Sequence, residues 1–303
     1  MQPAHGRPWA GFLRTKYWMP KQRNETLWDY KARVIDAISP SFCAAKWNNA
    51  TIWLNSGQTA SCYHPRAHAI DRAALVDNPS ALHNTPQKKI ARAQMLKGER
   101  PAECEYCWII EDVSKAVSDR VLETSRYSDE QIAITASTPI EQDVTPRTLE
   151  IAFDRACNFA CAYCNSSFST TWANDIRQNG PYTGLTSQGT RVFTHDSPWT
   201  QPFKPGEENP YLDAFWRWWP ELSQTLQELR VTGGEPTTHP EFWRLLDHLS
   251  DNPSAMHFAV NSNLGVKEEL MDRLIAKAQN IEHFKVYTSC ESVGRQRSTS
   301  ATG

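Results

Sequence analysis

The sequence has no apolar run approaching the roughly 18 residues that a membrane-spanning helix needs. Its N-terminus carries basic residues but no apolar stretch of the kind that marks a secretory signal. The formal net charge is only -2, and no basic run has interleaved aromatic residues. These absences argue against a membrane protein, a secreted protein and a nucleic-acid-binding protein, so we expect a cytoplasmic protein.

The composition is that of a globular protein. The chain has 303 residues, of which 40% are hydrophobic and 22% are charged. This balance excludes intrinsic disorder, and the length allows one large domain or two of ordinary size. Twelve tryptophans indicate either large aromatic core residues or a stacking surface, and composition does not distinguish the two.

The eight cysteines fall into two groups and a singleton. Disulfides are disfavoured in a reducing compartment, so clustered thiols favour metal or iron–sulfur ligands. One group has the spacing C-x3-C-x2-C, and the other has a C-x2-C pair with two candidate partners further upstream. The first group is Cys157, Cys161 and Cys164, the second is Cys43, Cys62, Cys104 and Cys107, and the singleton is Cys290.

Composition divides the chain into an N-terminal extension 1–40, a small α+β module 41–123, a linker 124–147 and a core 148–303. Residues 43–63 are predicted to form a hairpin with its turn at Asn55-Ser56-Gly57. Residues 86–100 are predicted to form a helix. The linker is predicted from its enrichment in Ser, Thr, Pro and Asp.

The core alternates predicted strands with predicted helices. The strands are expected at 148–153, 229–232, 257–263 and 284–290, and the helices at 168–178, 211–228, 241–249 and 267–278. This alternation indicates βαβ units and a parallel sheet, and therefore an α/β fold. The spacing of Phe215, Trp216 and Trp219 favours core packing over a substrate cleft.

Three thiolates on the loop after the first core strand can converge on one metal centre. With three protein ligands, a [4Fe–4S] cluster keeps one iron open for chemistry. The alternative is a zinc site completed by a histidine or by Cys290. Spacing alone leaves both possibilities open.

The residues around these cysteines carry a family resemblance. The loop Cys-Asn-Phe-Ala-Cys-Ala-Tyr-Cys follows the first core strand, and Gly233-Gly234-Glu235-Pro236 follows the second. The two motifs in this order resemble those of the radical S-adenosylmethionine (SAM) enzymes. The resemblance implies a partial (β/α)6 barrel and a SAM-binding [4Fe–4S] cluster, held by Cys157, Cys161 and Cys164.

In that family, SAM is cleaved reductively and a 5′-deoxyadenosyl radical abstracts hydrogen from the substrate. The resemblance therefore implies an enzyme of oxidoreductase or lyase type with SAM as cofactor, a reductant such as flavodoxin or ferredoxin, and a peptide, protein or small-molecule substrate. The residues that it implies for SAM binding are Tyr163, Gly233, Gly234, Glu235, Asn261, Ser289 and Glu291. The family more often has aspartate near the position of Glu291, so this chain departs from the pattern there.

The upstream cysteines resemble the SPASM/twitch modules that carry auxiliary clusters. In those modules one cysteine begins a hairpin, a second follows it, and a short helix ends in a further pair, as with Cys43, Cys62, Cys104 and Cys107. The resemblance implies a closed auxiliary [4Fe–4S] cluster suited to electron transfer. Such modules usually follow the radical SAM core, whereas these cysteines precede it. The alternative is a structural zinc site in a non-catalytic interaction module.

The core is expected to be incomplete at its C-terminal end. Four strands are predicted after residue 148, and only about a dozen residues follow Cys290. Two further βα units need more chain, because each crossover takes a dozen residues or more. We therefore expect a partial barrel that lacks its last strands, with activity that this loss could impair.

Overall fold

The computed structural model describes residues 24–114, 116–187, 191–194, 203 and 207–289. These residues form two compact units. Unit 1 consists of the described residues up to Ala50, together with Ala60–Arg66 and His83–Val144; unit 2 consists of Thr51–Thr59, Ala67–Leu82 and the described residues from Thr145 onward. No helix in the described part of the chain has the length and apolar character needed to cross a bilayer.

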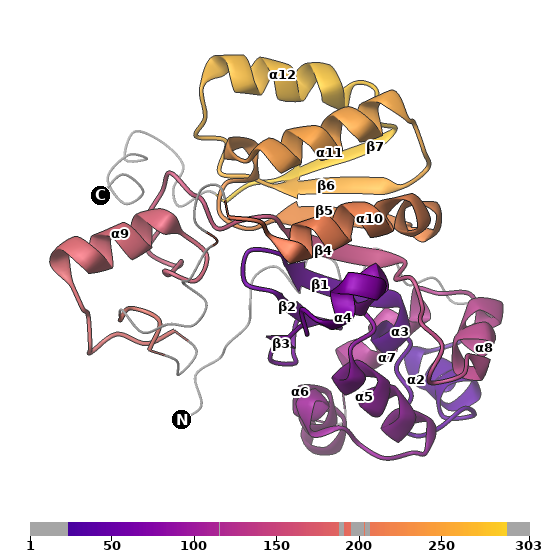
Figure 1. The fold of residues 1–303 in the computed structure, drawn as a ribbon. Coiled ribbons are helices and arrows are strands. Elements are labelled where there is room, and N and C mark those ends of the chain that lie inside the picture. Colours follow the sequence, from indigo (N-terminus) through magenta and orange to yellow (C-terminus); the bar gives the residue numbers. More distant parts are fainter. Residues whose placement is uncertain (1–23, 115, 188–190, 195–202, 204–206, 290–303) are drawn as a thin grey trace. The chain divides into compact units, whose positions relative to one another are not determined.

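Seven strands form one mixed sheet in the order β3-β2-β1-β4-β5-β6-β7 (Figure 1). Their bounds are β1 Asn49–Trp53, β2 Gln58–Ala60, β3 His68–Ala69, β4 Thr148–Ala152, β5 Glu228–Thr232, β6 His257–Asn261 and β7 His283–Tyr287. The last four strands pair in parallel, whereas β2 and β3 are antiparallel. The predicted α/β fold is therefore confirmed, and every strand expected after residue 148 is present.

The predicted hairpin is formed by β1 and β2, which are neighbours in the sheet. Residues 54–57 connect them, and Gly57 has a φ of +63°, which a glycine adopts at low steric cost. β1 also lies next to β4, and the backbone N–H of Leu54 donates to Ala152 O at 2.9 Å. The sequence places this hairpin in the upstream module, whereas its strands extend the sheet beyond β4.

The two faces of the parallel strands differ in character. Arg230 Nη1 lies 3.3 Å from Glu150 Oε2 across neighbouring strands. The Arg230 guanidinium also lies 5.1 Å from the centroid of the Tyr287 ring. This face is polar and half-buried. The alternate residues form an apolar, fully buried face: Leu149, Ile151, Leu229, Val231, Phe258 and Val260.

The helices of unit 2 occur where the sequence predicts them, with short additional turns. Their bounds are α4 Ala74–Asp77, η2 Pro79–Leu82, α9 Thr170–Asn179, α10 Pro210–Thr225, η6 Pro236–Thr238, α11 Pro240–Asp251 and α12 Glu268–Ala278. Asn209 caps α10, because its Oδ1 accepts from the backbone N–H of Tyr211 at 3.0 Å. Phe215 and Trp219 are 0% and 4% exposed, so the aromatic spacing reflects core packing, as predicted.

Unit 1 is built mainly from short helices. Their bounds are α2 Leu27–Tyr30, η1 Lys31–Ile35, α3 Ala45–Asn48, α5 Pro86–Leu96, η3 Ala102–Cys104, α6 Glu105–Ile109, η4 Ile110–Ser114, α7 Asp119–Ser125 and α8 Asp129–Ser137. The helix expected at 86–100 is α5, with proline in its first turn. Tyr30 and Ile35 lie fully buried in the core of the unit. The described part of the expected N-terminal extension 1–40 therefore belongs to this unit.

The segment 124–147 is not the linker that its composition suggests. It contains α8, which begins with a capping box: Ser128 Oγ accepts from the N–H of Gln131 at 3.1 Å, and Gln131 Oε1 accepts from the N–H of Ser128 at 3.1 Å. Ile132, in the first turns of α8, is 1% exposed and packs in the core of unit 1. The expected linker is thus wrong here, because a helix with a strong cap and a buried apolar side chain lies within it.

Candidate functional site

The three-cysteine loop connects β4 to α9, and the first turn of α9 holds it in place. Thr171 Oγ1 donates to the carbonyl of Cys157 at 2.7 Å, and Trp172 Nε1 donates to the carbonyl of Cys161 at 3.0 Å. Within the loop, the N–H of Cys164 donates to Cys161 O at 2.9 Å. All three cysteines are partly buried and free. The loop is therefore a fixed bend whose three thiols come from one short segment.

The glycine motif after β5 lies directly against this loop. The N–H of Glu235 donates to Ala156 O at 2.7 Å, and that of Gly234 donates to Asp154 O at 3.3 Å. A Cβ on Gly234 would lie 2.1 Å from Ala156 O, and one on Gly233 would lie 2.4 Å from Asp154 O. The sequence assigns these glycines to close approach by SAM. In the structure they admit the backbone of the cysteine loop.

Glu235 is buried at 1% exposure and links the ends of two strands. Its Oε1 accepts from Ser262 Oγ at 2.8 Å and from the N–H of Thr237 at 3.1 Å. Its Oε2 accepts from the N–H of Asn263 at 2.7 Å. The carboxylate thus ties the turn after β5 to the end of β6, which positions both beside the cysteine loop.

The segment after β6 contacts the cysteine loop through the side chain of Asn263. Asn263 Nδ2 donates to Asn158 Oδ1 at 2.8 Å and lies 3.8 Å from Cys157 Sγ, within range of a hydrogen bond to sulfur. Two residues earlier, Asn261 Oδ1 is buried and has no hydrogen-bond partner. A buried acceptor without a donor is costly in a folded protein, so this oxygen is a candidate for contact with a bound ligand.

Tyr163 and Ser289 are the other described residues that were predicted for SAM binding. Tyr163 is 63% exposed. Ser289 is exposed and follows the end of β7 by two residues. Glu291, like Cys290, lies outside the described residues.

Sequence reasoning missed three side chains that organise the site: Thr237, Ser262 and Asn263. The signal for the last two was present, because both follow directly after a parallel strand, where binding groups gather in α/β folds. Thr237 contacts a residue close to it in the sequence, so its role depends on local structure. It lies two residues after Glu235, and its hydroxyl and its N–H both donate to the Glu235 carboxylate.

Burial sets the protonation of the loop thiols. It raises the pKa of Cys157, and it raises the pKa of Cys164 to about 11. The backbone of Phe159 directs a hydrogen bond to the sulfur of Cys157. Both thiols are therefore neutral at physiological pH in the absence of a cation, and coordination to a metal would deprotonate them.

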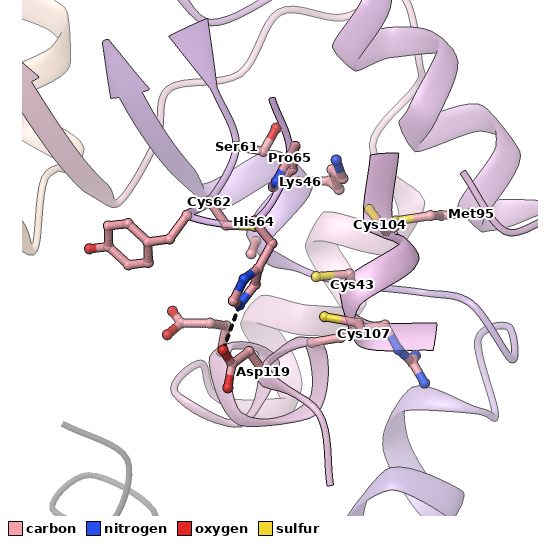
Figure 2. Close-up of a pocket in the computed structure, with 14 residues that line it drawn as sticks. Cys43, Lys46, Ser61, Cys62, His64, Pro65, Met95, Cys104, Cys107 and Asp119 are labelled. Atoms are coloured by element: carbon pink, nitrogen blue, oxygen red, sulfur yellow. Dashed lines mark hydrogen bonds and ion pairs between the residues drawn. The ribbon is translucent and has the colours of Figure 1, made fainter. Parts of the chain in front are cut away.

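The four upstream cysteines line one cavity in unit 1 (Figure 2). Figure 2 shows Cys43, Cys104 and Cys107 on one side of the cavity, and Cys62 with His64 on the other. The cavity has a volume of about 40 Å³, and a single water needs roughly 10–15 Å³ on that scale. The sequence grouped these four thiols by their spacing and by resemblance to an auxiliary-cluster module, and the fold brings all four to one cavity.

Separate elements supply these four thiols. Cys43 precedes α3, Cys62 follows β2, Cys104 ends η3 and Cys107 lies in α6. Burial raises the pKa of Cys43 to about 11 and that of Cys107 to about 12, and it also raises the pKa values of Cys62 and Cys104. The thiols are thus neutral and free without a cation.

Polar groups around the cavity complete its lining. The backbone of Ala45 directs a hydrogen bond to the sulfur of Cys43, and the backbone of His64 directs one to Cys62. Ser61 Oγ is buried at the cavity and has no hydrogen-bond partner. Hydrogen bonds to thiolate sulfur are a recurrent feature of iron–sulfur sites, where they tune the potential.

No three His, Cys, Asp or Glu side chains in the described part of the chain are placed to hold a single metal ion. A tetrahedral zinc, at about 2.3 Å from each sulfur, needs its ligands close together. A [4Fe–4S] cube separates its ligand sulfurs by the width of the cube and tolerates wider spacing. The described thiols are therefore not gathered around a single ion.

Comparisons with known proteins identify no relative. No family model matches the chain, no curated protein matches it, and no solved structure matches it. The functional conclusion therefore depends on this chain's own residues and geometry.

Proposed function

We propose that the chain is a cytoplasmic radical SAM enzyme that cleaves SAM reductively at a three-cysteine [4Fe–4S] cluster and abstracts hydrogen from its substrate. One observation carries the proposal. The cysteine loop after β4 and the Gly-Gly-Glu turn after β5 are hydrogen-bonded backbone to backbone, at the carboxyl edge of a parallel sheet. Ligand sites of α/β folds form at that edge.

The donor set fits the cofactors. Cys157, Cys161 and Cys164 supply three soft sulfur ligands, and three ligands leave one iron of a [4Fe–4S] cluster open. Asn261 Oδ1 is buried without a partner, and Glu235 Oε2 accepts a single hydrogen bond, so both oxygens can accept another. The methionyl ammonium of SAM is a cationic donor of the kind that such acceptors bind well.

Each chain residue has a distinct task in this proposal. The first turn of α9 fixes the loop that carries the thiols. Glu235 orients the ends of β5 and β6 around the ligand, and Asn263 donates toward Cys157 Sγ. When bound, the cluster and SAM supply hydrogen abstraction by a 5′-deoxyadenosyl radical. The protein's contribution is to bind, to orient and to exclude water.

The sheet supports a barrel-type core. We infer that β4 to β7 correspond to the first four strands of a partial (β/α)6 barrel. One face of these strands is apolar, and the other carries Glu150 and Arg230. A face that carries these charges is suited to a polar substrate, either a peptide or a small molecule. A reductant such as flavodoxin or ferredoxin would supply the electron.

The four-cysteine cavity supports an auxiliary [4Fe–4S] cluster in the same chain. Four thiols would occupy all four irons, so this centre would transfer electrons rather than bind SAM. The alternative is zinc at this site, in a non-catalytic module. Four thiols that line one cavity, with backbone hydrogen bonds directed to the sulfurs of Cys43 and Cys62, support the cluster.

The test is anaerobic reconstitution with iron and sulfide, followed by incubation with dithionite and SAM. Two clusters predict brown protein with about eight iron per chain, and formation of 5′-deoxyadenosine. Brown protein that forms no 5′-deoxyadenosine would refute SAM cleavage. Colourless protein with stoichiometric zinc would refute both clusters and favour the interaction module.

A further inference from the structure

A buried lysine lies at the four-cysteine cavity. Lys46 is 1% exposed and lines the cavity, and it follows Cys43 by three residues on α3. Its ammonium forms an ion pair with Glu103, and its charge acts on the neighbouring Cys104 thiol, whose pKa it lowers against the larger rise caused by burial. Buried lysines are rare unless paired, so this charge is held at the thiols by the fold.

The charges of this pair are not equally shielded from water. The side chain of Lys46 is 2% exposed, whereas that of Glu103 is 20% exposed. A charge in contact with water is screened more strongly than one in the low-dielectric interior. The field that reaches the cavity from the pair is therefore positive.

A second buried cation supports this sign. Arg120 also lines the cavity, and its side chain is 1% exposed. It pairs with Glu111 on one side and donates to Phe42 O at 2.7 Å on the other. Arg120 is thus fixed by two partners, whereas Lys46 has Glu103 as its charged partner and lines the cavity beside the thiols.

A four-thiolate cluster is an anion in both oxidation states, and reduction adds one more negative charge. A cation held at a ligand sulfur stabilises the reduced form more than the oxidised form. Hydrogen bonds to the sulfurs and local charge are established means by which proteins set cluster potentials.

We propose, on the basis of the proposed function, that Lys46 raises the reduction potential of the auxiliary cluster and that Glu103 limits the rise. Lys46 is a positioning and tuning residue in this role, since it does not contact the substrate. Its function is to keep the auxiliary centre reducible by the electron donor.

The experiment measures the potential of the auxiliary cluster alone. The parent is the full chain with Cys161→Ala, in which the SAM-binding cluster is lost, and the readout is a dithionite titration followed by electron paramagnetic resonance. Lys46→Met removes the charge and retains most of the length of the side chain. Glu103→Gln retains the shape and removes the opposing charge. Lys46→Arg keeps the charge, and Lys89→Met is the matched control, because Lys89 pairs with Asp143 and does not line the cavity.

We expect Lys46→Met to lower the potential by about 59 mV, which is a tenfold change in the reduction equilibrium for one electron. Glu103→Gln should raise the potential, and Lys46→Arg and Lys89→Met should leave it near the parent value. A purely structural role would not produce shifts of opposite sign. If Lys46→Met holds no cluster, Glu103→Gln decides: a higher potential supports the proposal, and an unchanged or lower one overturns it.

Failure of the tuning role can be told apart from failure of the proposed function. A parent that holds about four iron, with a potential that neither substitution shifts, overturns the role of Lys46 and leaves the auxiliary cluster standing. A parent that binds no iron, or binds zinc, overturns the auxiliary cluster and the tuning role together.

Discussion

Substitution of Gly234 by alanine tests the contact on which the candidate SAM site depends. The added Cβ would lie 2.1 Å from Ala156 O, whereas real Cβ contacts stay above 3.0 Å. The turn after β5 and the cysteine loop must therefore separate by roughly 0.9 Å. Gly233 is a poorer test, because its φ of +126° adds backbone strain to the clash.

The magnitude follows from what the separation breaks. The bonds from Glu235 N to Ala156 O at 2.7 Å and from Gly234 N to Asp154 O at 3.3 Å would both lengthen beyond hydrogen-bonding range. Two lost bonds at about 0.5–1.5 kcal/mol each and overpacking at about 1–3 kcal/mol give a loss of about 2–6 kcal/mol in the free energy of unfolding.

Urea denaturation of the apo protein measures this loss, and deuterium uptake across residues 153–169 locates it. The matched control is Gly184→Ala, since no atom of the described residues lies within 4 Å of a Cβ at that position. The control should unfold like the wild type, or be more stable by up to about 1 kcal/mol through a less flexible unfolded chain. If Gly234→Ala unfolds within about 0.5 kcal/mol of Gly184→Ala, the described contact between turn and loop is not required.

Three further outcomes test the two sites and the core of unit 1. Cys161→Ala should abolish 5′-deoxyadenosine formation and leave the auxiliary cluster visible by electron paramagnetic resonance; retained product would contradict the assignment of the loop. Cys107→Ala should lower the iron content by about half while 5′-deoxyadenosine still forms, and an unchanged iron content would show that Cys107 is not a ligand. Burial, followed by the charges of Lys88 and Arg92, lowers the pKa of His83 well below its usual value of 6.5. The imidazole of His83 therefore stays neutral in the folded protein, whereas in the unfolded chain it takes up a proton. The free energy of unfolding should fall by about 1.4 kcal/mol per pH unit below pH 6.5 because of this difference. Urea unfolding at pH 7.5, 6.5 and 5.5 checks this slope, which His83→Gln should remove.

Much of the fold could be predicted from the sequence, because its periodic segments are strong. The four strands after residue 148 and the helices between them lie where alternation and helical spacing place them. Asn209 and Pro210 are a further start signal for α10, which the prediction from helical spacing did not use. These are local signals, and local signals survive folding when the tertiary structure agrees with them.

The linker predicted at 124–147 was wrong because it was inferred from amino-acid composition rather than from capping and burial patterns. Residues 124–147 are rich in turn-forming residues, yet Ser128 and Gln131 spell a capping box, and Ile132 is buried behind it. The capping box was a readable signal that enrichment in Ser and Thr obscured. The position of β1 beside β4 had no local signal, because strand neighbours are chosen by long-range packing.

At the candidate sites, too, the sequence predicted local features and missed long-range contacts. Spacing grouped the three loop cysteines, because ligand spacing within one segment is a local property. The four cysteines of the cavity come from separate segments, and the resemblance to an auxiliary-cluster module grouped them. It could not reveal that Gly234 fits against Ala156, or that Asn263 reaches Asn158, because these contacts join segments distant in sequence. The roles of such residues depend on the folded backbone.

The division of the chain into two units has a consequence for how the protein can be taken apart. The polypeptide passes from one unit to the other five times, at 50/51, 59/60, 66/67, 82/83 and 144/145. Removing all residues before 145 would remove β1 and leave β4 as an exposed edge strand of the sheet. Exposed edge strands pair with other chains and cause aggregation. Residues 145–289 are thus not an independent fragment, and a fusion protein built from them would need to include the β1–β2 hairpin as well.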